Sequence, residues 1–177
     1  GEAMRHYSDP ADLKQAMVQL LGRHLQASRV VLWQLRKDDW AVVDQCYSDG
    51  VSQFEGRYPL DDFVRPLFAK LRAGHNVISA DIQNDPDHSP AQKAACEALQ
   101  LAAQLSVPTF SDGELLGVIG VYQCRPRRWT ENEIELVKST AQRVNDTVSR
   151  ALAQCRLRDS EQLLLEAVSY THLTLPT

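Results

Sequence analysis

Hydrophobic residues recur along the chain with two different spacings, one typical of helices and one typical of strands. Apolar positions three and four residues apart predict helices over about 10–26, 61–74 and 91–99. Alternating or continuous apolar runs, separated by polar turns, predict strands over 29–35, 40–47, 77–80, 103–110 and 115–123. Short turns join two pairs of these strands into hairpins. We therefore expect an α+β fold, with a largely antiparallel central sheet of about five to six strands and helices on both faces.

The helix starts carry recognisable signals. Asp9 followed by Pro10 predicts a capped start of the first helix, and Asp61 or Asp62 is the candidate cap of the second. Residues 130–133 (Thr-Glu-Asn-Glu) form the sequence of a capping box, which predicts the start of the last helix.

Apolar or small residues continue along this last helix at alternating spacings of three and four. They are Ile134, Val137, Ala141, Val144, Val148, Ala151 and Cys155. In its first half, this heptad pattern favours packing on the chain's own sheet and pairing with another helix equally. Beyond Ala151 the predicted domain has ended, and pairing with a second copy of the chain explains the pattern better.

The predicted strand over 115–123 is apolar on both faces, so both faces of the sheet should be covered. We expect the first and last helices on one face, and the second and third helices on the other. Gly117 and Gly120 fall on opposite faces of this strand. Each predicts the close approach of a ligand, a backbone or a tightly packed helix.

Composition and charge narrow the class of protein. The net charge of -4 argues against a nucleic-acid-binding surface, and no apolar run is long enough to span a membrane. The four cysteines are widely spaced and predict reduced thiols in a cytoplasmic protein rather than disulfides or a zinc site. Because residue 1 is Gly, we expect a piece of a longer protein.

The run VPTFSDGELLGVIGVYQCRPRRWTENEIELVKSTAQRV (107–144) resembles the end of a GAF domain. The hairpin, helix and short strand over 29–81 fit the same family, and the resemblance covers about 12–155. It implies a six-stranded sheet with a pocket on one side, and a role as a small-molecule sensor, light sensor or dimerisation module in bacterial signalling proteins.

The flanking segments are interpreted separately. Residues 1–11 are a lead-in, and 156–168 resemble the helical linker that precedes a PAS domain in sensor histidine kinases. That likeness implies a downstream PAS or kinase module and a homodimer joined through the last helix. Residues 169–177 show no helical period, and we interpret them as a tail outside the fold.

The resemblance also suggests residues for a pocket. The candidate ligand-binding residues are Trp33, Tyr58, Phe63, Asp81, His88, Cys96, Leu105 and Tyr122, and Phe68, Leu99 and Val107 are further wall residues. Apolar walls with a few polar groups are typical of ligand sites, but also of an ordinary core. The core interpretation is favoured for Trp33 and Tyr122, and a solvent-exposed loop position is favoured for His88.

Specific chemistries are disfavoured by missing motifs. The bilin-attaching Cys of phytochrome-like GAF domains would align near Ala91, with a His or Tyr at Gln92, so a covalent bilin is not expected. A cyclic-nucleotide motif is absent. The paired cysteines of free methionine sulfoxide reductases are also missing, which leaves Cys96 and Cys124 as weak candidates and Cys124 as a packed strand-end residue. We expect a sensory domain rather than an enzyme, with the reductase and a bilin photosensor as alternatives.

Overall fold

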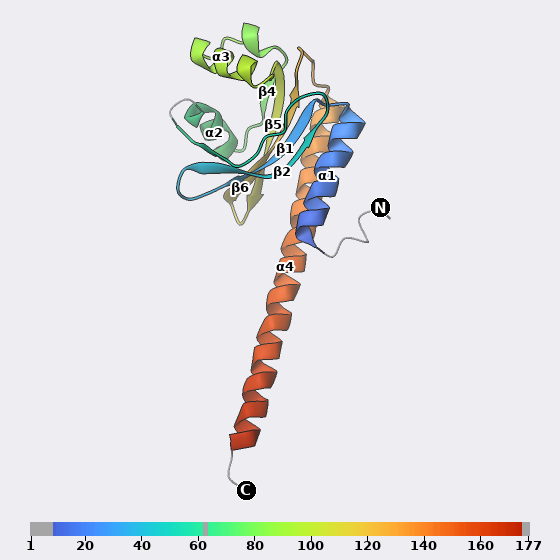
Figure 1. Cartoon of the computed structure of the whole chain (residues 1–177), viewed down its shortest axis with the longest axis vertical. Coiled ribbons are helices and arrows are strands. Elements are labelled where there is room, and N and C mark those ends of the chain that lie inside the picture. The colour runs from blue at the N-terminus through green and yellow to red at the C-terminus, as the bar shows by residue number, and fades with distance from the viewer. Residues whose placement is uncertain (1–8, 62–63, 175–177) are drawn as a thin grey trace.

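The computed structural model describes residues 9–61 and 64–174 (Figure 1). Its helices are α1 (Pro10–Leu25), α2 (Arg65–Arg72), α3 (Pro90–Ala98) and α4 (Glu131–Thr174), with a short 3-10 turn η2 (Ile82–Asn84). Its strands are β1 (Arg29–Leu35), β2 (Trp40–Ser48), β3 (Arg57–Pro59), β4 (Val77–Ser79), β5 (Ala103–Ser111) and β6 (Glu114–Gln123). These six strands form one sheet in the order β3-β2-β1-β6-β5-β4, and every neighbouring pair is antiparallel. The α+β prediction is confirmed, and β3 is the strand that the sequence did not reveal.

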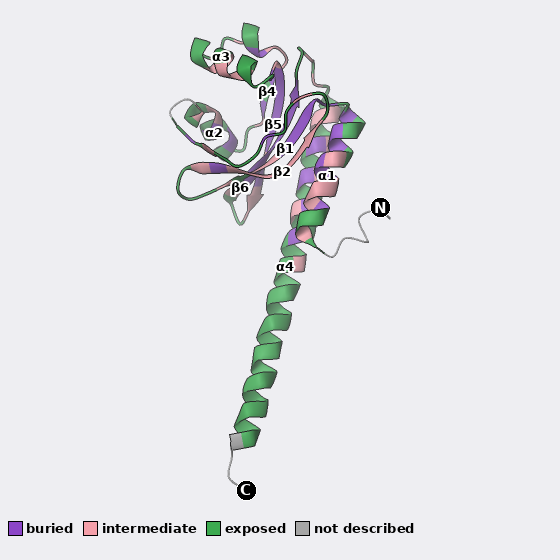
Figure 2. Cartoon of the chain, viewed as in Figure 1, coloured by how far each residue is buried: buried purple, intermediate pink, exposed green. Residues whose placement is uncertain are grey.

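Helices cover both faces of this sheet, as expected. Helices α1 and α4 pack side by side on one face, where they bury a core shared with β1, β5 and β6 (Figure 2). Helices α2 and α3 lie on the other face, over two smaller apolar clusters (Figure 1). Because β6 is central and covered on both sides, its apolar residues on both faces are explained.

The capping predictions have mixed outcomes. Asp9 accepts a hydrogen bond from the Ala11 amide, and Thr130 and Glu133 form the reciprocal bonds of a capping box. Helix α2, however, begins only at Arg65 and has no side-chain cap at its N-cap residue Val64. The prediction of Asp61 as the cap is therefore wrong, and the alternative, Asp62, lies outside the described residues.

Helix α4 has two parts with different surroundings. Up to Val148 its apolar stripe is buried in the chain's own core, which decides between the two interpretations of the heptad pattern there. From residue 152 onward the helix projects from the domain, and its side chains are exposed over 152–173 (Figure 2). It continues through 169–174, so the expectation of non-helical structure there is wrong. In the described part of the chain, no helix is long and apolar enough to cross a membrane.

The two glycines of β6 each face a close neighbour, and in neither case is it a helix. A side chain at Gly120 would collide with the ring and hydroxyl of Tyr122, which lies back over the strand. A side chain at Gly117 would collide with the backbone carbonyl oxygen of Trp33 on β1. Gly120 therefore makes room for a side chain, and Gly117 for the neighbouring backbone.

Candidate ligand site between α2, α3 and the sheet

A cavity of about 370 Å³ lies between α2, α3 and the sheet. Its apolar wall comes from the start of α2 and from β4, including Val64, Leu67 and Val77. Its polar wall comes from the loop before α3, from α3 itself and from β5, and includes Asp85, His88, Gln92, Cys96 and Gln104. The volume and the mixture of apolar wall and few polar groups are those of a small-molecule site.

Local hydrogen bonds hold the His88 loop in place. The Asp85 carboxylate accepts from the Asp87 amide at 2.9 Å, and the His88 amide donates to the Asp85 carbonyl at 3.2 Å. Helix α3 then begins with a capping box made by Ser89 and Gln92. The imidazole is thereby turned inward and its side chain is only 12% exposed. The prediction of a solvent-exposed His88 is wrong.

The imidazole presents one polar atom without a partner. Nε2 of His88 lies 3.2 Å from the amide nitrogen of Gln104, and because that nitrogen can only donate, Nε2 accepts and Nδ1 carries the proton. Nδ1 is buried and forms no hydrogen bond with any described residue. It lies 3.4 Å from Oδ2 of Asp85, close enough for electrostatic attraction but not aligned for a hydrogen bond. A buried donor in this state lacks the hydrogen bond that such groups normally make.

A family match covers most of the chain. The GAF domain family model matches residues 9–148. The chain belongs to the GAF domain family.

Solved GAF structures have the same fold at low sequence identity. The blue-light absorbing form of the PixJ GAF domain from Thermosynechococcus elongatus superposes with a TM-score of 0.71 at 19% identity, over 95% of each chain. The far-red absorbing dark state of JSC1_58120g3 with bound biliverdin IXa superposes with a TM-score of 0.70 at 18% identity, over 86% of this chain and 94% of that one. Bacteriophytochrome RpBphP3 from R. palustris superposes with a TM-score of 0.77 at 15% identity, over 93% of this chain and 39% of that one. No curated protein matches the sequence.

An aromatic cluster lies beside the cavity of this GAF domain. Trp33, Phe54, Tyr58 and Tyr122 pack with ring centroids 5.5 to 6.2 Å apart, and Trp33 Nε1 donates to the Tyr122 hydroxyl at 3.1 Å. Burial raises the pKa of Tyr122 against the opposing effect of hydrogen bonds with Trp33 and Ser106. The structure thus brings together three predicted residues, and adds Phe54, which lies in the irregular stretch between two strands.

Electrostatics set the charge states around the loop. Burial by itself would raise the pKa of Asp85, but the nearby Ser79 side chain, the hydrogen bond from the Asp87 amide and the electrostatic effects of His88 and Lys70 lower it below its usual range. Asp85 is therefore a carboxylate at neutral pH. On α3, burial raises the pKa of the Cys96 thiol, so Cys96 enters the cavity wall as a neutral group.

Several predicted residues do not join this site. Leu105 and Val107 point to the opposite face of the sheet, into the core under α1 and α4. Asp81 accepts from the Asn84 side chain at 2.8 Å and is not part of the cavity wall, and Leu99 is 40% exposed. Phe68 belongs to α2 and is buried in the apolar cluster between that helix and the sheet, outside the cavity wall. Phe63 lies outside the described residues.

Two buried polar residues of β5 were missed by sequence reasoning. Gln104 and Ser106 alternate with Leu105 and Val107, so they face α2 and α3, and both are almost completely buried. A signal existed in the sequence, since polar residues alternating with apolar ones inside a covered strand mark a polar patch on one face. Cys124 also differs from expectation, because it is exposed rather than packed.

Proposed function

We propose that this GAF domain is the sensory module of a bacterial signalling protein, and that it binds a small ligand in the cavity between α2 and α3. The observation that carries the proposal is the cavity itself, whose wall includes His88 held by Gln104, with an Nδ1 that has no hydrogen-bond partner among the described residues. The apolar wall favours a partly apolar molecule. The polar wall favours a molecule that also carries hydrogen-bonding groups.

Replacement of His88 by Ala should abolish retention of this ligand. Native mass spectrometry of the purified chain should show a bound small molecule in the wild type. The molecule should be absent from His88→Ala, and Gln104→Glu should retain it at reduced occupancy. His75→Ala is the matched control, because His75 is exposed and outside the cavity wall. A wild type that retains no molecule and binds none from a library of metabolites would contradict the proposal.

The proposed output runs through α4 to a second copy of the chain. Beyond the domain, Leu157 and Leu164 are 61% and 66% exposed and lie seven residues apart, with Val168 four residues further on. This spacing suits a helix pair. We infer a homodimer that passes the change in the cavity to a downstream module, of the PAS or histidine kinase type, in a cytoplasmic two-component protein.

Two pairs of glutamate substitutions test the dimer. Leu157→Glu with Leu164→Glu should give a monomer in sedimentation velocity, because two like charges per chain would be buried against their copies. Cys155→Glu with Gln162→Glu has the same spacing on the opposite face of the helix and should leave the dimer intact. If Cys155→Glu with Gln162→Glu is the monomeric variant instead, the contact lies on the stripe that ends at Cys155. A monomeric wild type would refute the dimer.

A bilin photosensor is the second candidate function. It is favoured by the solved structures above, which include a blue-light absorbing GAF domain, a bacteriophytochrome and a far-red absorbing protein with bound biliverdin IXa, and by the presence of Cys96 in the cavity wall. The chain offers His88 and an apolar wall, but its cysteine is in the last turn of α3 and protonated. We therefore expect any bilin to be held without a covalent bond.

Expression together with a biliverdin-producing enzyme tests this second candidate. Noncovalent binding predicts visible absorption in the native protein and no zinc-dependent fluorescence after denaturation. Fluorescence that persists after denaturation and disappears in Cys96→Ser would show a covalent bond and contradict the expectation. A colourless protein would exclude bilin and leave the small-ligand proposal in place.

We propose that the domain has no catalytic activity of its own. A thiol enzyme needs a thiolate, and burial raises the pKa of both Cys46 and Cys96, which disfavours that form. The reductase alternative can be tested directly. Cys96→Ser with Cys124→Ser would abolish methionine sulfoxide reduction if the alternative were true, whereas we expect no activity in either protein.

A further inference from the structure

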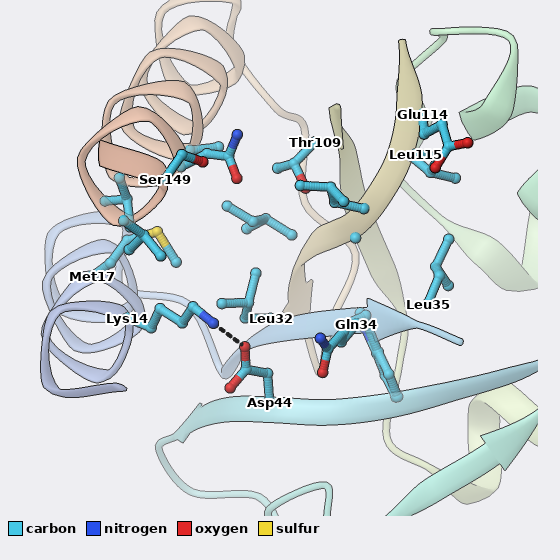
Figure 3. Close-up of a pocket in the computed structure, with 18 of the residues that line it drawn as sticks. Lys14, Met17, Leu32, Gln34, Leu35, Asp44, Thr109, Glu114, Leu115 and Ser149 are labelled. Carbon is cyan, nitrogen blue, oxygen red and sulfur yellow. Dashed lines mark hydrogen bonds and ion pairs between the residues drawn. The ribbon is translucent and has the colours of Figure 1, made fainter. Parts of the chain in front are cut away.

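A second cavity, of about 460 Å³, lies on the opposite face of the sheet (Figure 3). It is lined by α1, by α4 over residues 141–152, by Asp44 in the middle of β2 and by residues of β1, β5 and β6, and Arg72 at the end of α2 also lines it. It shares no lining residue with the α2–α3 cavity. Occupation of one cavity can therefore be tested independently of the other.

Two β-bulges contribute residues to the wall of this cavity. In the pairing of β1 with β2, Leu32 faces Gln45 and Trp33 faces Val43, so Asp44 is an extra residue. In the pairing of β5 with β6, the same shift makes Leu116 an extra residue. Asp44 and Leu116 both line the cavity. Bulges bend a strand and redirect a side chain, and they are frequent next to functional sites.

The cavity has an apolar side and a charged side. Met17, Leu32, Ile119, Val144, Val148 and Leu152 supply the apolar side. Lys14 and Asp44 supply the charged side, with 2.8 Å between Nζ and Oδ2 and side chains 28% and 21% exposed (Figure 3).

The charges around the cavity favour an anion. Besides the Lys14–Asp44 pair, the lining includes three further cations, Arg36, Lys37 and Arg72, and one further anion, Glu114. The lining therefore has a net positive charge. A ligand that complements it has an apolar body and a negative group.

We propose that this cavity binds an amphipathic monocarboxylate of the fatty-acid type. The hydrocarbon chain lies against α4 and β6, and the carboxylate pairs with Lys14. Such a ligand contacts α4 where the helix leaves the domain, next to Asn145, whose side chain donates to the Phe110 carbonyl at 3.3 Å. The domain then has a second input that acts on the output helix directly, beyond the function proposed above.

Titration of the full chain with dodecanoate tests the steric part of this proposal. Calorimetry should show saturable binding to the wild type. Ser149→Phe places a ring at the mouth of the cavity and should weaken binding at least about tenfold. Ser139→Phe is the matched control, since Ser139 is also an exposed serine of α4 but lies outside the lining. If the wild type does not bind dodecanoate, the proposal is overturned. This includes the case in which a second copy of the chain covers the cavity.

Charge variants test the carboxylate part and identify the cavity. Lys14→Met should weaken dodecanoate binding about tenfold, because it removes a charged partner. Asp44→Asn should strengthen dodecanoate binding, because Lys14 is then free to pair with the ligand. If the Lys14–Asp44 pair has only a structural role, Asp44→Asn should weaken binding instead. Lys70→Met alters the α2–α3 cavity and should have no effect. Weakening by Lys70→Met but not by Lys14→Met would overturn the proposal.

Discussion

Gly117→Ala should destabilise the domain more than an alanine at any other glycine of the sheet, by about 3 kcal/mol. The new methyl group would meet the carbonyl oxygen of Trp33, which belongs to the backbone of β1. Gly117 is paired with Gln34 of β1 and Thr109 of β5, so the strand cannot move away without breaking the ladder on both sides. The neighbour that would have to yield is rigid, and therefore the substitution is costly.

Urea unfolding of three alanine variants measures this effect. Gly120→Ala should cost about 2 kcal/mol, because its neighbour is a side chain, Tyr122, that can shift at the expense of its hydrogen bond with Trp33. Gly113→Ala has open space but a positive φ of 78°, and should cost about 1 kcal/mol. The order Gly117, Gly120, Gly113 is the expected result. A smaller effect at Gly117 than at Gly113 would contradict the steric explanation.

Local sequence signals predicted most of the fold. The capping box of Thr130 and Glu133 involves residues three apart, so it can be recognised without knowing any distant contact. The same applies to Asp9 and Pro10 at the start of α1. Ser89 and Gln92 form another such box, and its sequence could have fixed the start of α3 one residue earlier than expected.

Features that depend on distant contacts could not be predicted in this way. Alternation along β5 shows that Leu105 and Gln104 point to opposite faces, but not which helices cover each face. For this reason Leu105 is a candidate pocket residue in the sequence and Gln104 is not, although the alternation marks a polar patch on the face of β5 that carries Gln104. The position of His88 depends on a contact with Gln104, sixteen residues away, and on the turn made by Asp85. The candidate site is built from such contacts, whereas the elements that carry it are built from local ones.

Arg29→Met should also destabilise the domain strongly, by about 3 kcal/mol. Arg29 lies at the start of β1 and is completely buried. Its Nε donates to the Ser52 carbonyl at 2.9 Å, its Nη1 donates to the Leu99 carbonyl at 3.0 Å, and its guanidinium lies 4.0 Å from the centre of the Phe54 ring. Methionine fills most of the space but donates no hydrogen bond, so both carbonyls lose a charged donor.

The cost of burying the Arg29 charge opposes this destabilisation, so the measured change in unfolding free energy shows which of the two effects is larger. Burial lowers the pKa of Arg29, and among the described residues no carboxylate pairs with it and its Nη2 has no hydrogen-bond partner. Removing an uncompensated buried charge relieves part of the loss. We expect the lost hydrogen bonds to dominate, because the same guanidinium joins the loop before β3 to the end of α3. A Met variant as stable as the wild type would show that the cost of burying the charge cancels the gain from its hydrogen bonds.

Thiol reactivity provides a local measurement of the same contact. The bond to Leu99 ties the end of α3 to the sheet, and Cys96 lies one turn before that end and is half-buried. Arg29→Met should therefore raise the rate at which Cys96 reacts with a thiol reagent, while the exposed Cys155 on α4 is unaffected. Arg36→Met, at the exposed end beyond β1, should change neither the unfolding free energy, within about 0.5 kcal/mol, nor the Cys96 rate. If the Cys96 rate is unchanged in Arg29→Met although the domain is destabilised, the arginine stabilises the core without positioning α3. The candidate ligand site would then depend on its own loop contacts alone.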